Sequence, residues 1–146
     1  MKKNLLLTLA LCLLAQWSVA QAPKWVEKAK RAVFSVVTYD ESDKILNTGN
    51  GFFVTEDGIA LSDYSLFKGA QRAVVINSEG TQMPVEVIMG ANDMYDVVKF
   101  RVAISGKKVP ALVVAPVAPT VGASIYLLPY SCLLYTSPSP RDPKTS

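Results

Sequence analysis

The chain has 146 residues, of which half are hydrophobic, and it carries a formal net charge of +3. It contains no histidine and only two cysteines, Cys12 and Cys132. The lack of histidine excludes a Ser-His-Asp triad, a Cys-His dyad and an imidazole metal site made from these residues alone. The length is sufficient for one small domain with its own hydrophobic core.

The first segment, residues 1–20, has the pattern of a secretory signal peptide. Lys2 and Lys3 precede the apolar run Leu5 to Leu14, and Ser18-Val19-Ala20 is a small-x-small cleavage site. The apolar run is too short to favour a membrane-spanning helix. We therefore expect cleavage after the last alanine of this site and a secreted or periplasmic protein of the bacterial envelope, without a membrane span.

The last segment, residues 132–146, resembles a translated sequencing adapter. Its sequence CLLYTSPSPRD is identical to one reading frame of a transposase end that is used to prepare sequencing libraries. Composition alone also allows a flexible tail rich in proline and serine. We expect this segment to be a disordered artefact, so that residues 21–131 form the domain and the natural sequence departs from the printed one near Ser131.

These two end segments account for the net charge and for both cysteines. Four of the fifteen cationic residues and one of the twelve acidic residues lie in them, which leaves eleven of each between residues 21 and 131. The basic isoelectric point therefore does not indicate a nucleic-acid partner or an anionic membrane surface. No disulfide is expected within the domain.

The domain begins with a helical pattern and continues with β patterns. Pro23 to Ala32 predicts a short helix, because Trp25, Ala29 and Val33 recur at spacings of four. The predicted strands are Val33–Tyr39, Phe52–Val54, Ile59–Leu61, Ala73–Ile76, Val85–Met89, Asp96–Val102, Ala111–Val114 and Ser124–Leu128. Many short strands with little helix indicate an all-β domain, either a closed barrel or a sandwich.

Two glycine motifs flank the second predicted strand, one before it and one between it and the third. Asp57-Gly58 predicts a hairpin, because glycine adopts a positive φ without penalty. Gly49-Asn50-Gly51 resembles a phosphate-binding loop only superficially, since a strand follows it and not a helix. We interpret it as a close-packed entry to a barrel strand.

Four carboxylates are candidates for a metal site or an acid–base group. Asp93, Asp96, Glu56 and Asp57 match no calcium loop, and the last two are explained by a hairpin tip. No metal or other cofactor is therefore predicted. Strand alternation places Asp96 on the same face as Val98, and we expect this face to be buried, so that the carboxylate holds a neighbouring group.

A second alternating pattern lies in the strand predicted for residues 85–89. The alternation predicts that Val85, Val87 and Met89 share one face of it.

Three stretches resemble the trypsin-like serine proteases, especially the bacterial high-temperature-requirement branch. GNGFFVTEDGIALSDYS, residues 49–65, is similar to the Gly-Ser-Gly-Phe segment that ends in the catalytic histidine. DVVKFR, residues 96–101, is similar to the strand that begins with the catalytic aspartate, and VGASIYLLPYS, residues 121–131, to the strand at the end of the first barrel. The resemblance spans Ala32 to Ser131 and implies the first, six-stranded antiparallel barrel of a two-barrel fold.

The resemblance places Ser65 at the histidine position and Asp96 at the aspartate position. It implies peptide or protein ligands and a second barrel as the packing partner; the nucleophile loop of that barrel has no counterpart in the 146 residues. Ser65 is predicted to be non-functional as a base. Three hypotheses follow: a non-proteolytic homologue with a binding or scaffolding role, part of an active serine endopeptidase whose other catalytic groups lie elsewhere, or an unrelated small β-barrel interaction module.

Overall fold

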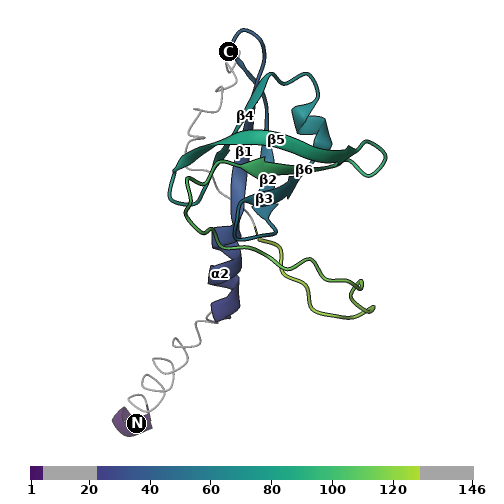
Figure 1. Cartoon of the computed structure of the whole chain (residues 1–146). Coiled ribbons are helices and arrows are strands. Elements are labelled where there is room, and N and C mark those ends of the chain that lie inside the picture. The colour runs from purple at the N-terminus through teal and green to yellow at the C-terminus, as the bar shows by residue number, and fades with distance from the viewer. Residues whose placement is uncertain (5–22, 129–146) are drawn as a thin grey trace, which may run out of the picture.

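The computed structural model describes residues 1–4 and 23–128 (Figure 1). The predicted apolar run and cleavage site of the signal peptide, and the adapter-like segment, lie outside these residues. Within the described part of the chain, none of the helices combines the length and the apolar character needed to cross a membrane.

The domain is a closed antiparallel barrel of six strands in the order β1-β2-β3-β6-β5-β4 (Figure 1). The strands are β1 Val33–Tyr39, β2 Ile45–Phe53, β3 Ile59–Ser62, β4 Arg72–Ile76, β5 Gln82–Asn92 and β6 Val97–Val102, and the helices are α2 Lys24–Ala32 and the 3₁₀ turn η2 Tyr64–Phe67. The prediction of an all-β domain with a short N-terminal helix is confirmed, and the barrel is the architecture formed.

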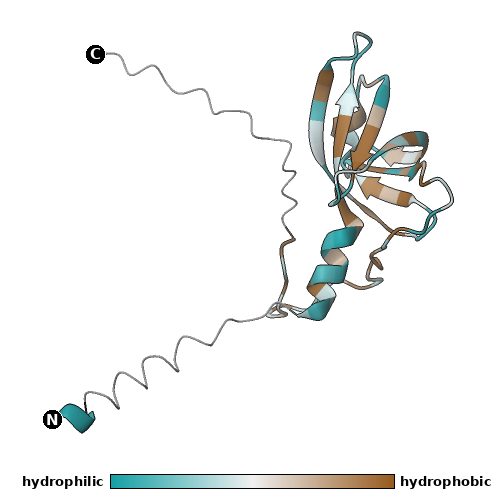
Figure 2. Cartoon of the chain, turned by 90° about the vertical axis from the view of Figure 1, so that its left-hand side faces the viewer, coloured by the Kyte–Doolittle hydropathy of each residue, from teal (hydrophilic) through white to brown (hydrophobic). Residues whose placement is uncertain are grey.

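The helix α2 leads directly into the first strand. Pro23 lies immediately before its first turn, where its fixed φ is compatible with helix initiation. Val26, Ala29 and Ala32 are buried, whereas the rest of the helix is mainly hydrophilic (Figure 2). The helix thus contacts the domain along one narrow apolar stripe.

Aromatic and branched side chains fill the inside of the barrel. The Phe34 ring lies with its centroid 4.7 Å from that of Phe53 and 6.3 Å from that of Phe100, both in edge-on geometry. The predicted alternation in β6 is confirmed for Val98, Phe100 and Val102, which are all buried. The cluster is completed by Val36, Ala60, Val75 and Met83.

Gly51 is a point of close approach between β2 and the core. A Cβ at this position would lie 2.5 Å from Cε2 of Phe34 and 2.7 Å from the carbonyl oxygen of Leu61. A Cβ at Gly49 would collide with the side chain of Leu66. This packing supports the interpretation of the Gly-Asn-Gly motif as an entry to a barrel strand.

The predicted hairpin at Asp57-Gly58 is confirmed. Gly58 has a φ of 93°, and the N–H of Val54 donates to the carbonyl oxygen of Ile59 at 2.8 Å. β2 and β3 then pair in antiparallel fashion from this turn.

The predicted strands Ala111–Val114 and Ser124–Leu128 are wrong, because the structure contains neither helix nor strand between residues 103 and 128. The N–H of Leu112 donates to the carbonyl oxygen of Phe53 at 2.8 Å, but this contact does not extend into a ladder. β1 begins at Val33, opposite Phe52, so only the end of β2 at Phe53 is open to Leu112, which is too short a stretch for a further strand. The apolar composition of this segment is typical of a strand, but the segment has no strand to pair with.

Candidate functional site

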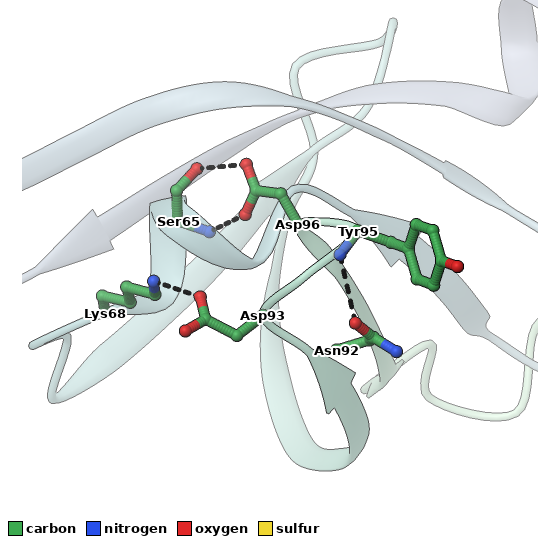
Figure 3. A network of polar contacts seen from close by, with 6 residues as sticks. All are labelled: Ser65, Lys68, Asn92, Asp93, Tyr95 and Asp96. Atoms are coloured by element: carbon green, nitrogen blue, oxygen red, sulfur yellow. Dashed lines mark hydrogen bonds and ion pairs between the residues drawn. The ribbon is translucent and has the colours of Figure 1, made fainter.

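The candidate site lies where β3 ends and β6 begins. Ser62 of β3 is paired with Val98 of β6, so the residues that follow one strand and precede the other lie side by side. η2 follows β3 and carries Ser65, and Asp96 lies directly before β6 (Figure 3). The barrel topology therefore brings together the two residues that the sequence singled out, although they are separated by 31 positions.

Ser65 and Asp96 form a two-point contact. The Ser65 hydroxyl donates to Oδ2 of Asp96 at 2.8 Å, and the Ser65 backbone N–H donates to Oδ1 at 2.6 Å (Figure 3). The N–H of Tyr64 donates to the main-chain carbonyl oxygen of Asp96 at 3.2 Å. Both carboxylate oxygens are therefore directed at the serine, and the backbone of η2 is tied to the residue before β6.

The expected burial of Asp96 is wrong. Its side chain is exposed, and its backbone has a φ of 48°, in the left-handed region. The N–H of Asp96 donates to the carbonyl oxygen of Asp93 at 3.4 Å, which closes a turn ahead of β6. Because β6 starts only at Val97, the strand alternation that predicted a buried carboxylate does not reach back to this residue.

A cation lies close to this carboxylate. Lys68 forms an ion pair with Asp93 (Figure 3), and its Nζ is also 5.2 Å from the centre of the Tyr64 ring. The hydrogen bonds from the Ser65 hydroxyl and backbone N–H, with a smaller contribution from the Lys68 charge, hold the pKa of Asp96 below its usual value. The hydrogen bond to Asp93 raises the pKa of Lys68. Asp96 is thus held as an anion.

Two residues that the sequence analysis missed position η2 on the barrel. The Thr38 hydroxyl donates to the carbonyl oxygen of Leu66 at 2.9 Å, and Nδ2 of Asn47 donates to the same oxygen at 3.2 Å. Thr38 is fully buried, and its Oγ1 also accepts the N–H of Asn47 at 3.1 Å. The available signal was a polar residue inside the apolar run of β1.

A contact between two aromatic rings also packs η2 against the core of the barrel. The Phe67 ring, on the turn of η2 that follows Ser65, lies with its centroid 5.1 Å from that of Phe100. The backbone bonds at Leu66 and this ring contact hold η2 from two sides.

The other two carboxylates that the sequence analysis considered lie at the opposite end of β6. Asp57 pairs with Arg101, with 3.4 Å between the nearest atoms, and Glu56 pairs with Lys108 at 3.1 Å. Arg101 lies near the end of β6, whereas Asp96 precedes its start. The structure therefore does not bring Glu56 and Asp57 together with Asp96. No group of three or more acidic, cysteine or histidine side chains in residues 1–4 and 23–128 is arranged to hold a metal ion.

The chemistry open to the Ser65–Asp96 pair is limited. An effective general base has a pKa near the operating pH, and the lowered pKa of Asp96 makes its carboxylate a weak base for a serine hydroxyl. A serine hydroxyl does not accept a proton near neutral pH. The geometry is that of a stable hydrogen-bonded anion, not of an activated nucleophile.

Neither the protein-family models nor the curated proteins gave a match to this chain. The comparisons assign no family. The resemblance to trypsin-like proteases rests on the three stretches described above.

Proposed function

We propose that this chain carries a protease-like β-barrel without proteolytic activity, secreted or periplasmic in the bacterial envelope, whose role is to bind or scaffold a peptide or protein. The observation that carries the proposal is the contact in which Ser65 occupies both carboxylate oxygens of Asp96. In the family that the sequence resembles, this aspartate orients the histidine that acts as general base.

The physical reason is the loss of the proton acceptor. In a Ser-His-Asp triad the aspartate holds the imidazole in the correct tautomer and stabilises the imidazolium. Proton transfer by a positioned base contributes about 10²–10⁴-fold to a rate. A chain with no histidine, in which Ser65 donates to the aspartate, retains the orienting group without the base that it would orient.

The test measures serine reactivity in the full chain. We expect no labelling by a fluorophosphonate probe and no release of fluorescence from labelled casein, with trypsin as the positive control. The variant Ser65→Ala is the matched control, since it removes the only candidate hydroxyl in contact with Asp96 among the described residues. Labelling of the wild-type chain that disappears in Ser65→Ala would contradict the proposal.

One observation favours a second function, part of an active serine endopeptidase. Asp96 is fixed in orientation by backbone and side-chain hydrogen bonds, as an orienting aspartate must be. This alternative requires a base and a Gly-x-Ser-Gly-Gly loop that the 146 residues do not contain. Sequencing the gene from unfragmented template beyond the codon for Ser131 distinguishes the two, because only the endopeptidase requires that loop and a histidine.

A further inference from the structure

One stretch of β5 lacks a strand neighbour on one side. β5 pairs with β4 only from Gln82 to Pro84, whereas it pairs with β6 from Val85 to Asn92. In an antiparallel strand, successive backbone groups point to alternate sides, and the pairing shifts between Val85 and Val87 and between Ile88 and Gly90 leave further groups outside the β6 ladder. Among the described residues, the backbone groups of residues 85–92 that point away from β6 therefore face no strand. We call this stretch the open β5 edge.

A small groove runs along the open β5 edge. It has a volume of about 200 Å³ and lies between residues 85–88 and the start of β4. Its apolar lining includes Phe67, Ala70, Ala73 and Val85. A dry cavity of about 150 Å³ accommodates benzene, so this groove has room for one aromatic or branched aliphatic side chain.

The side chains of the open β5 edge are apolar and accessible. Val87, Ile88 and Met89 are 50%, 45% and 46% exposed. A Cβ added at Gly90 would contact nothing within 4 Å, which shows how open the strand is here. Exposed apolar edges of this kind are templates for pairing with another chain.

Glu86 is the one charged residue between positions 85 and 92 and has no ion pair among the described residues. Arg72, across the groove, is already paired with Asp43 and stacks 3.6 Å from the centre of the Tyr39 ring. The edge therefore offers backbone hydrogen bonds and apolar contact, with a single negative charge that disfavours acidic ligands.

We propose that the open β5 edge binds an extended, apolar segment of another polypeptide by strand addition, with one of its side chains in the groove. An extended backbone is the occupant that satisfies a row of unpaired N–H and C=O groups, and alternate side chains then supply specificity. The inference deepens the binding role proposed above and rests on it, since it gives that role a surface and a ligand class.

The edge is linked to the Ser65–Asp96 site. Lys68 follows η2 and Asp93 follows β5, and their ion pair joins the two segments. Phe67 of η2 lines the groove beside residues 85–88. A peptide on the open β5 edge thus lies next to the segment that carries Ser65, without needing any chemistry from it.

The first arm of the test uses a fluorescein-labelled peptide of alternating valine and serine, flanked by lysines, and the full chain. Fluorescence anisotropy is expected to show saturable binding. A second peptide of the same sequence, N-methylated at alternate residues, cannot donate the ladder hydrogen bonds and is expected to bind at least tenfold more weakly. Equal binding of the two peptides, or no binding of either, would overturn the proposal.

The second arm changes the protein. Val87→Lys places a charge on the open β5 edge and is expected to weaken peptide binding at least tenfold. Val113→Lys is the matched control, because Val113 is an exposed valine in the segment after β6, 94% accessible, and does not line the groove. Circular dichroism checks that each variant is folded, and Met89→Lys replaces Val87→Lys if the latter is not. Equal loss of binding in the Val113→Lys control would refute the assignment to this edge.

Other outcomes separate the two proposals. Sedimentation velocity that shows a dimer broken by Val87→Lys, with no peptide bound, would assign the edge to a second copy of this chain and overturn the peptide proposal. Failure of the peptide to bind, together with no fluorophosphonate labelling, refutes only the edge. Peptide binding together with labelling that Ser65→Ala abolishes refutes only the non-proteolytic function.

Discussion

Replacement of Thr38 by valine tests how the barrel positions the candidate site. The substitution keeps the branched shape of the side chain and removes a hydroxyl that is fully buried. The N–H of Asn47 then loses an acceptor at 3.1 Å, and the Leu66 carbonyl loses a donor at 2.9 Å. The carbonyl keeps Nδ2 of Asn47 at 3.2 Å, so the main cost is the lost hydrogen bond from the half-buried N–H of Asn47.

The loss of one intramolecular hydrogen bond costs about 0.5–1.5 kcal/mol. We therefore expect Thr38→Val to lower the free energy of unfolding by about 0.5–1.5 kcal/mol. In a domain of this size each kcal/mol corresponds to a fall in Tm of about 4–8 °C. The amide hydrogen of Ser65 should also exchange faster, because Leu66 of the same turn has lost an anchor to the barrel.

Urea unfolding followed by circular dichroism gives the stability, and hydrogen exchange gives the local effect. The matched control is Thr48→Val, which removes an exposed hydroxyl one residue after Asn47 and should change stability by no more than about 0.5 kcal/mol. If Thr38→Val is as stable as the control and the Ser65 amide exchanges at the wild-type rate, Thr38 does not hold η2 on the barrel.

Two further predictions concern the β2 glycine and the Asp96 carboxylate. Gly51→Ala should destabilise the domain by about 1–3 kcal/mol in urea unfolding, because its Cβ would lie 2.5 Å from the Phe34 ring. Gly90→Ala is the control, since its Cβ meets open space, and it should be neutral or slightly stabilising. Equal effects of the two substitutions would refute the close packing at Gly51. The hydrogen bond from the Ser65 hydroxyl is the main cause of the lowered pKa of Asp96. The ionised carboxylate therefore stabilises the fold fully at pH values above 3.8, the usual pKa of an aspartate. This stabilisation is lost as the pH falls through the lowered pKa. The stability difference between wild type and Ser65→Ala should therefore be seen at about pH 6 and shrink at about pH 2, and a difference that is the same at both pH values would contradict this.

The alternation of side chains predicted the barrel core well because a regular strand allows no other arrangement. In β6 the period of two places Val98, Phe100 and Val102 inside, as expected. The prediction that Val85, Val87 and Met89 share one face of β5 was wrong for a physical reason. The pairing with β6 shifts between Val85 and Val87 and again between Ile88 and Gly90, and each such bulge resets the alternation.

The candidate site was predictable in its members but not in its surroundings. Ser65 and Asp96 were singled out by resemblance, and the structure brings them into contact. Asp96 has a left-handed φ, which aspartate adopts more readily than most residues. The alternation of side chains along a strand does not predict such a φ, so it did not predict the exposure of Asp96. The role of Thr38 depends on Leu66, 28 positions away, and no local pattern in the sequence links the two.

The same arrangement is compatible with the proposed protease-like barrel that lacks a histidine base. Ser65 and Asp96 are both exposed, on short connections outside β3 and β6, and neither belongs to the core cluster around Phe34 and Phe100. The backbone N–H of Ser65 also donates to the carboxylate, and this bond does not use the serine side chain. Because exposed positions contribute little to stability, a serine here costs the fold little, but it cannot supply an imidazole. The binding role proposed for the open β5 edge therefore requires no particular side chain at position 65.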